Sequence, residues 1–160
     1  MIVIADTSPI SYLVSIGEID ILPKLFGRVL VPPSVADELR HPRAPESVRS
    51  WVAAPPAWFE GRAPGLAPDE ELLRADLEIG ERDAILLAQE LGADELIIDD
   101  MCGRREAERR HLPVTGTVGV LRAASRLGLL DLRDAFERLR RTNFHIAESV
   151  LERLIREEKT

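Results

Sequence analysis

The sequence predicts a single α/β domain, built on a mostly parallel sheet with helices on both of its faces. Short apolar, β-branched segments alternate with longer amphipathic segments along the 160 residues, and this alternation is typical of a parallel sheet with crossover helices. A chain of this length suits one domain. Its composition, 45% apolar and 31% charged, is that of a globular protein. We expect one domain over residues 1–160 and a sheet of four to five strands.

The first half of the chain predicts strands at 1–5, at 28–31 and near Trp58. Ser8 before Pro9 indicates a helix N-cap followed by proline at the first helical position, and this helix ends at Gly17. Three further helices are predicted over 19–26, broken near Pro23, over 34–40, capped by Ser34, and over 45–52.

The second half predicts a partly helical acidic segment over 68–79 and then a helix that starts near Gly80 and ends at Gly92. The remaining elements are strands at 96–98 and 112–114, helices at 104–110 and 118–127, and two C-terminal helices within about 131–158.

The charge pattern restricts the kinds of partner. A net charge of −7 argues against a large static phosphate-binding surface, but it is compatible with a nuclease, because an acidic metal site itself lowers the net charge. Arg104, Arg105, Arg109 and Arg110 lie in one seven-residue window. They form either a local phosphate-binding patch or an exposed helix face with acid–base pairs.

Cys102 is the only cysteine, which excludes a disulfide framework and a thiolate metal cluster. No apolar run approaches the ~20 residues that cross a bilayer, and the start of the chain lacks the basic segment of a signal peptide. We therefore expect a cytoplasmic protein with no membrane partner.

Acidic residues gather where the predicted strands end, and the ligands of an open parallel sheet bind at that edge. Several carboxylates in one pocket repel one another, and a divalent cation relieves that repulsion. Oxygen ligands without cysteine or histidine favour Mg²⁺ or Mn²⁺. The candidates are Asp6, Glu38, Glu81, Asp83, Asp99 and Asp100.

Local roles remain open for most of these residues. Asp6 could cap the following helix, and Asp37 is a rival to Glu38. Glu81 and Asp83 also suit a helix N-terminus, and at i and i+2 only one of them is expected to face the site. The possible supporting hydroxyls belong to Thr7, Ser8 and Thr117, although helix capping is the more common role of such residues. The histidines are scattered, so no catalytic histidine is assigned.

In this order and spacing, five segments resemble the PIN-domain ribonucleases, in particular their VapC-like toxin branch: 4–9 (IADTSP), 31–39 (VPPSVADEL), 80–85 (GERDAI), 98–100 (IDD) followed by Gly103-Arg104, and 114–117 (VTGT). The resemblance implies a three-layer α/β/α PIN-like fold and an endoribonuclease of a toxin–antitoxin pair. It implies an RNA substrate, a small antitoxin protein and a homodimer as partners. It further implies that Mg²⁺ or Mn²⁺ is held by Asp6, Glu38, Asp83 and Asp100. We expect Asp99 as a further metal ligand and Glu81 and Arg104 as possible supporting residues.

Two other acid-based families fit less well. A haloacid dehalogenase phosphatase needs an acid where this chain has Ser8, and a receiver domain needs a late lysine that is absent between Lys24 and Lys159. A non-catalytic interaction module with the same fold is the alternative that remains open.

Overall fold

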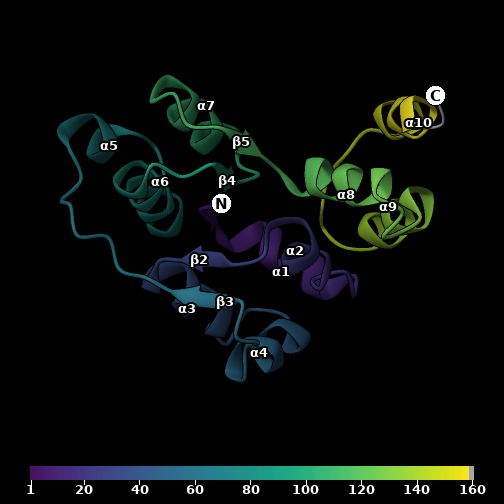
Figure 1. Ribbon diagram of the computed structural model, residues 1–160, viewed down its shortest axis with the longest axis horizontal. Helices are drawn as coiled ribbons and strands as arrows, with labels where there is room; N and C mark the ends of the chain where they lie inside the picture. The colour runs from purple at the N-terminus through teal and green to yellow at the C-terminus, as the bar shows by residue number, and fades with distance from the viewer. Residues whose placement is uncertain (159–160) are drawn as a thin grey trace.

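The computed structural model describes residues 1–158 as a five-stranded, entirely parallel sheet flanked by helices (Figure 1). The strands lie in the order β3-β2-β1-β4-β5. Their bounds are β1 Val3–Ala5, β2 Val29–Val31, β3 Phe59–Gly61, β4 Glu95–Ile97 and β5 Val114–Thr115. The predicted α/β class is confirmed. All five predicted strands are present, although each is short.

The first half of the chain contributes the helices α1 Thr7–Ser15, α2 Ile21–Phe26, α3 Pro33–Arg40, α4 Glu46–Ala53 and α5 Glu70–Arg74. The second half contributes α6 Ile79–Leu91, α7 Met101–Arg109, α8 Thr117–Arg126, α9 Leu132–Arg140 and α10 Glu148–Glu158. No helix within residues 1–158 is both long enough and apolar enough to cross a membrane.

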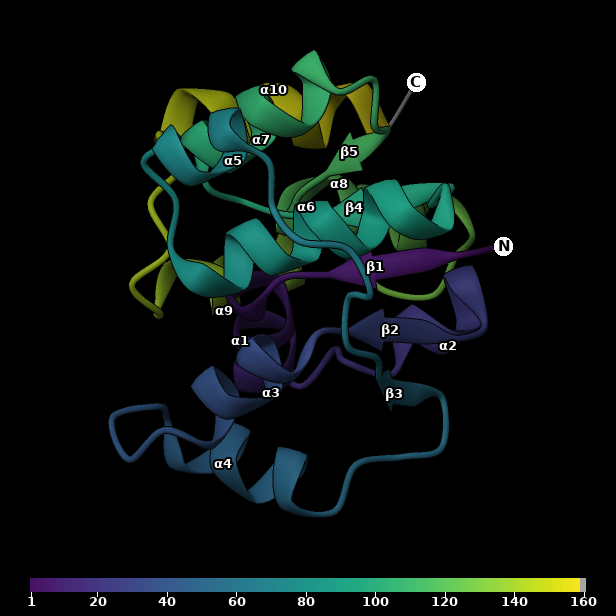
Figure 2. The ribbon, with the colours of Figure 1, turned by 90° about the vertical axis from the view of Figure 1, so that its left-hand side faces the viewer.

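The sheet separates two apolar clusters, because alternate side chains of a strand point to opposite faces. Ile4, Leu30 and Leu96 pack with α6 and α7 on one face. Val3, Val29 and Ile97 belong to the larger cluster with α1, α2, α8 and the two C-terminal helices. Figure 1 shows these layers on the two sides of the sheet, and Figure 2 shows α6 lying over the strands. The strands β1 and β2 are therefore fully apolar and buried, as expected for strands of a sheet that is covered on both sides.

Three expected helix boundaries were wrong. Asp6, and not Ser8, occupies the N-cap position of α1, and Pro9 lies in the first helical turn. Pro23 lies within α2 without breaking it. Ser34 lies inside α3, whose N-cap position is Pro32. The physical reason is the same in each case, because first-turn N–H groups have no partner within the helix and proline is therefore tolerated there.

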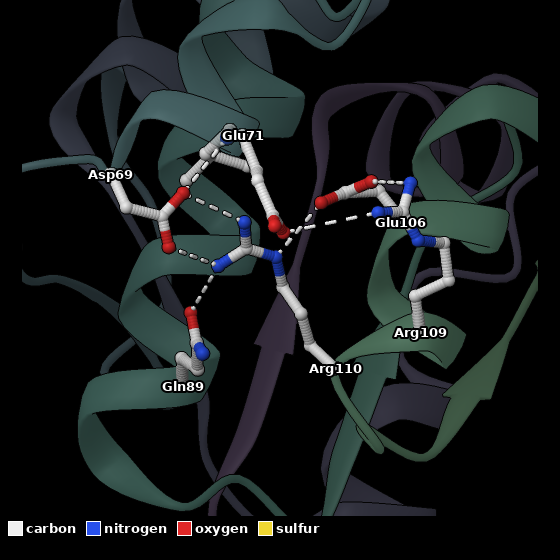
Figure 3. Close-up of polar contacts among 7 residues, drawn as sticks. Asp69, Glu71, Gln89, Glu106, Arg109 and Arg110 are labelled. Atoms are coloured by element: carbon white, nitrogen blue, oxygen red, sulfur yellow. Dashed lines mark hydrogen bonds and ion pairs between the residues drawn. The ribbon is translucent and has the colours of Figure 1, made fainter.

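Two of the four clustered arginines form an internal network and not a phosphate-binding patch (Figure 3). The side chain of Arg110 is 8% exposed and lies 3.0 Å from the buried Glu106 carboxylate. It also binds Asp69 at 2.9 Å and Gln89 at 2.9 Å. The hydrogen bond from Arg110 lowers the pKa of Asp69 to about 2. Arg109 pairs with Glu106 at 3.1 Å. The network ties α7 to α6 and to the start of α5.

Replacing Arg110 with Ala should lower the free energy of unfolding by about 3 kcal/mol, because the Glu106 carboxylate would lose its buried partner. Urea denaturation at pH 7 measures the change. Asp69→Asn is the matched control and should cost less, because Asp69 is exposed. A loss below about 1 kcal/mol for Arg110→Ala would mean that Arg109 alone holds Glu106.

Candidate active site

The carboxyl ends of β1 and β4 open into a pocket of about 150 Å³, which we call the acidic pocket. This edge of the sheet lies at the left of Figure 2, where α1 and α6 begin. Four separate segments of the chain supply its carboxylates, as the strand-end rule predicts. The lining residues are Asp6, Thr7, Ser8, Glu38, Glu78, Glu81 and Asp100.

Asp6 is the most buried acid of the pocket. It directly follows β1, and its backbone N–H donates to the Ile97 carbonyl of β4 at 2.9 Å. Its side chain is 4% exposed, and Oδ1 has no hydrogen-bond partner. Burial raises the pKa of Asp6 to about 7, with the charges of Glu38 and Asp99 adding to the effect. An unpartnered buried carboxylate oxygen is costly and requires an explanation.

Glu81 is the second buried acid, at 7% exposed, and it lies in the first turn of α6. Its Oε1 accepts the Glu78 backbone N–H at 3.0 Å, which forms a capping box. Its Oε2 has no hydrogen-bond partner. Burial raises the pKa of Glu81, and the charge of Asp100 adds to the effect. Gly103 makes room for the Ile98 side chain and for this carboxylate, since a Cβ atom there would lie 2.6 Å from Ile98 Cδ1 and 3.2 Å from Glu81 Oε2.

Glu38 reaches the pocket from α3. Its carboxylate accepts the Thr7 hydroxyl and, at 3.2 Å, the Gly80 backbone N–H. Gly80 packs directly beneath it, because a Cβ atom there would lie only 2.7 Å from Oε1. Asp37, the rival candidate, is exposed and pairs with Arg40.

Asp99 and Asp100, which follow β4, point to different places and have different partners. Asp100 lines the acidic pocket and caps α7 by accepting the Gly103 N–H at 3.1 Å. Asp99 accepts the Thr117 N–H at 2.7 Å and the Thr117 hydroxyl at 2.6 Å. Burial raises the pKa of Asp99, although these hydrogen bonds and the Arg104 charge oppose the rise. Asp99 therefore anchors the start of α8 and does not line the pocket.

Asp83 does not line the acidic pocket either. Its carboxylate accepts the Ser34 hydroxyl at 2.7 Å and pairs with Arg82 at 3.4 Å, so it joins α6 to α3. The expectation that one member of the Glu81 and Asp83 pair faces the site agrees with this geometry, and that member is Glu81. The sequence reasoning missed Glu78, whose available signal was the Glu-x-x-Glu spacing of the capping box at the start of α6.

The donor set fits a hard divalent cation. Only oxygen atoms line the pocket as ligands, and two buried oxygens lack partners. No three acidic, histidine or cysteine side chains in residues 1–158 are already arranged as a closed metal site. Glu38, Glu81 and Asp100 each accept a hydrogen bond from the protein, so we expect side-chain rotations when a cation binds.

Comparison with known proteins adds one finding. A family model described as a PIN domain matches residues 2–160, which is nearly the whole chain. No curated protein and no solved structure matches the chain. The match does not distinguish a VapC-like branch, so that part of the resemblance stays a prediction.

Without metal, wild-type protein should lose stability as pH rises from about 4 to about 7. The folded protein keeps the Asp6 proton up to about pH 7, whereas the usual pKa of 3.8 applies on unfolding, and the state that binds more protons is favoured at low pH. Asp6→Asn removes this loss and should stabilise the metal-free protein at pH 8 by up to about 4 kcal/mol. Urea denaturation in EDTA at pH 5 and pH 8 tests this, and an equal gain at both pH values would contradict it.

Gly80→Ala should weaken binding of Mn²⁺ by about 10- to 100-fold, because the added methyl group displaces the Glu38 carboxylate. The free energy of unfolding should stay constant or rise, since Ala favours a helix over Gly by about 1 kcal/mol. Isothermal titration calorimetry and urea denaturation measure the two effects. Gly61→Ala is the matched control, because nothing lies within 4 Å of a Cβ atom there. Unchanged Mn²⁺ affinity in Gly80→Ala would remove Glu38 from the site.

Proposed function

The chain belongs to the PIN-domain family, a nuclease-type fold, and we propose that it is a metal-dependent endoribonuclease that hydrolyses RNA phosphodiester bonds. One observation carries the proposal: Asp6 Oδ1 and Glu81 Oε2 are buried and without partners, and both residues line a pocket that Glu38 and Asp100 also line. A divalent cation is the ligand that compensates converging buried carboxylates.

We assign Mg²⁺ or Mn²⁺ as the cofactor and Asp6, Glu38, Glu81 and Asp100 as its candidate ligands. The resemblance implied Asp83 in place of Glu81, but Asp83 is engaged by Ser34 and Arg82. Asp99, also expected at the metal, instead positions the N-terminus of α8 through Thr117. Arg104 acts there as well, by its charge on Asp99.

When bound, such a cation lowers the pKa of a coordinated water and neutralises charge that develops on the phosphoryl group. The chain's own residues supply the orientation. The Thr7 hydroxyl holds one oxygen of Glu38, and the Gly80 N–H holds the other. The exposed Ser8 hydroxyl lines the same pocket, where it can donate to a phosphate oxygen. Burial of Asp6 and Glu81 keeps water from competing for their free oxygens.

The toxin role, the antitoxin and the homodimer are further parts of the proposal, and they rest on the resemblance to VapC-like toxins. Ile79 and Met101 support a protein partner near the site, because each begins a helix beside the acidic pocket and is more than half exposed. Light scattering of the purified protein tests the dimer. Growth arrest on expression, relieved by a cognate small protein, tests the toxin role.

The rival function is a non-catalytic interaction module. The observation in its favour is that the carboxylates of residues 1–158 are not yet assembled as metal ligands. A protein that binds metal and a protein partner but leaves RNA intact would establish this alternative.

The proposed activity should appear as cleavage of single-stranded RNA that requires Mg²⁺ or Mn²⁺ and is stopped by EDTA. Asp6→Asn and Glu81→Gln should each reduce the rate by at least about 100-fold, because each removes a metal ligand. Gel-resolved cleavage of a labelled RNA at several metal concentrations gives the rates.

Two isosteric changes serve as controls. Asp37→Asn alters an exposed carboxylate beside Glu38, and Asp83→Asn alters one outside the acidic pocket. Both should retain most of the activity. Full activity in Asp6→Asn would exclude the proposed site. If Asp83→Asn lost RNA cleavage and Glu81→Gln retained it, Asp83 would replace Glu81 as a ligand, as the resemblance implies.

A further inference from the structure

A second and larger cavity of about 680 Å³ adjoins the acidic pocket, and we call it the α1 groove. The two share Thr7, Ser8, Glu38 and Glu78, so a ligand held at the acidic pocket continues directly into the groove. A volume of this size suits a small ligand or part of a chain. The groove lies between α1, residues 41–45 after α3, and residues 142–143 in the connection from α9 to α10.

The wall that α1 contributes is made of hydroxyl groups. Thr7, Ser8, Ser11, Tyr12 and Ser15 line the groove, whereas Pro9, Ile10 and Leu13 of the same helix are buried. Among residues 1–158, Arg43 is the only arginine or lysine that lines it. Phosphate charge therefore contributes little to binding here, and affinity must come from hydrogen bonds and from stacking.

The only tyrosine and the only asparagine of the chain meet in this groove. The Tyr12 hydroxyl donates to Asn143 Oδ1 at 2.9 Å. The Tyr12 ring is held edge-to-face against Phe144, with the ring centroids 5.0 Å apart. Since Tyr12 engages the amide oxygen of Asn143, the amide N–H₂ group is the part left to meet a ligand, and it carries two hydrogen-bond donors.

We infer that the α1 groove binds a nucleotide of the RNA next to the cleaved bond, and that Tyr12 and Asn143 recognise its base. This inference rests on the proposed function. Tyr12 offers an aromatic surface for stacking, which is how single-stranded RNA bases are commonly held. The Asn143 amide donates to a carbonyl oxygen of the base. Uracil and guanine present such an oxygen where cytosine and adenine present an amino group, so the groove selects uracil or guanine.

The Tyr12 hydroxyl has a separate role from the Tyr12 ring. It fixes the Asn143 amide with its donors facing the ligand, and without it the amide can turn and accept from an amino group. Tyr12→Phe should therefore relax the base preference while keeping the stacking surface. Asn143→Asp should shift the preference toward adenine and cytosine, because a carboxylate only accepts hydrogen bonds.

Cleavage of a sequence-randomised pool of single-stranded RNA, followed by sequencing of the cut ends, tests this inference. Wild type should enrich uracil or guanine at one position beside the cut. Tyr12→Phe should weaken that enrichment at least about threefold, and Asn143→Asp should reverse it, since a mismatched donor pair costs about 1–3 kcal/mol. Ser50→Ala, an exposed change on α4 away from the groove, should leave the preference unchanged. An unchanged preference in both groove variants would overturn the inference.

A binding measurement separates failure of the groove from failure of the proposed function. Fluorescence anisotropy of a labelled single-stranded RNA hexamer that alternates uridine and guanosine, with Ca²⁺ in place of Mg²⁺, gives the affinity of each variant without turnover. Tyr12→Leu should weaken binding about tenfold, because one stacked base is lost, and Ser50→Ala should not. If wild type cleaves no RNA but binds the RNA about tenfold more tightly than Tyr12→Leu does, the groove is supported and the nuclease function fails. Equal binding by wild type and Tyr12→Leu, or no binding by wild type, would overturn the inference.

Discussion

Mutual repulsion among converging carboxylates, of which Asp6 and Glu81 are buried, is the constraint on which the candidate site depends. Short parallel strands bring Asp6 and Asp100 to one edge, and α3 and α6 add Glu38 and Glu81. Each charge must then be met by a hydrogen bond, by a proton or by a cation. The protein donates hydrogen bonds to both oxygens of Glu38 and to one oxygen each of Glu81 and Asp100, but it leaves Asp6 Oδ1 and Glu81 Oε2 without a partner. These two oxygens still need a positively charged or hydrogen-bonding partner, and that need is the physical basis for proposing a metal in this pocket.

Glycine residues make the close approach of these acids possible. Gly80 lies beneath Glu38, Gly103 beneath Glu81, and Gly116 beneath Asp99, where a Cβ atom would lie 2.7 Å from Oδ1. None of the three has a positive φ angle, so the reason for glycine is space and not backbone conformation. The glycines that open α6 and α8 in the sequence are thus part of the construction of the site.

The sequence predicted the fold class because the alternation of buried strands and helices depends on simple periodicity. It also predicted Asp6 and Asp100 at one edge from their strand-end positions, whereas Glu38, which lies in α3, could be preferred to Asp37 only through the family resemblance. It could not rank Glu81 above Asp83, because the choice depends on which side chain is already engaged, here Asp83 by Ser34 of a distant helix. The local Glu106–Arg110 pair agrees with one of the two interpretations of the arginine cluster, but its burial was not predicted, since the other Arg110 partner, Asp69, is 41 residues away. Long-range pairing, which composition and spacing do not encode, accounts for both.

In the proposed function, a protein of net charge −7 acts on a polyanion, which requires acidic and RNA-binding groups to lie in separate places. The acidic pocket repels phosphate until a cation neutralises it, whereas the neighbouring groove has hydroxyl, amide and aromatic groups and needs no neutralisation. The two cavities share a wall that includes Glu38, and Glu38 is therefore the group through which occupation of one cavity would change affinity at the other. Such coupling is reciprocal, so a cation that raises RNA affinity is itself held more tightly when RNA is bound. RNA binding could in this way complete a metal site whose carboxylates are only partly assembled beforehand.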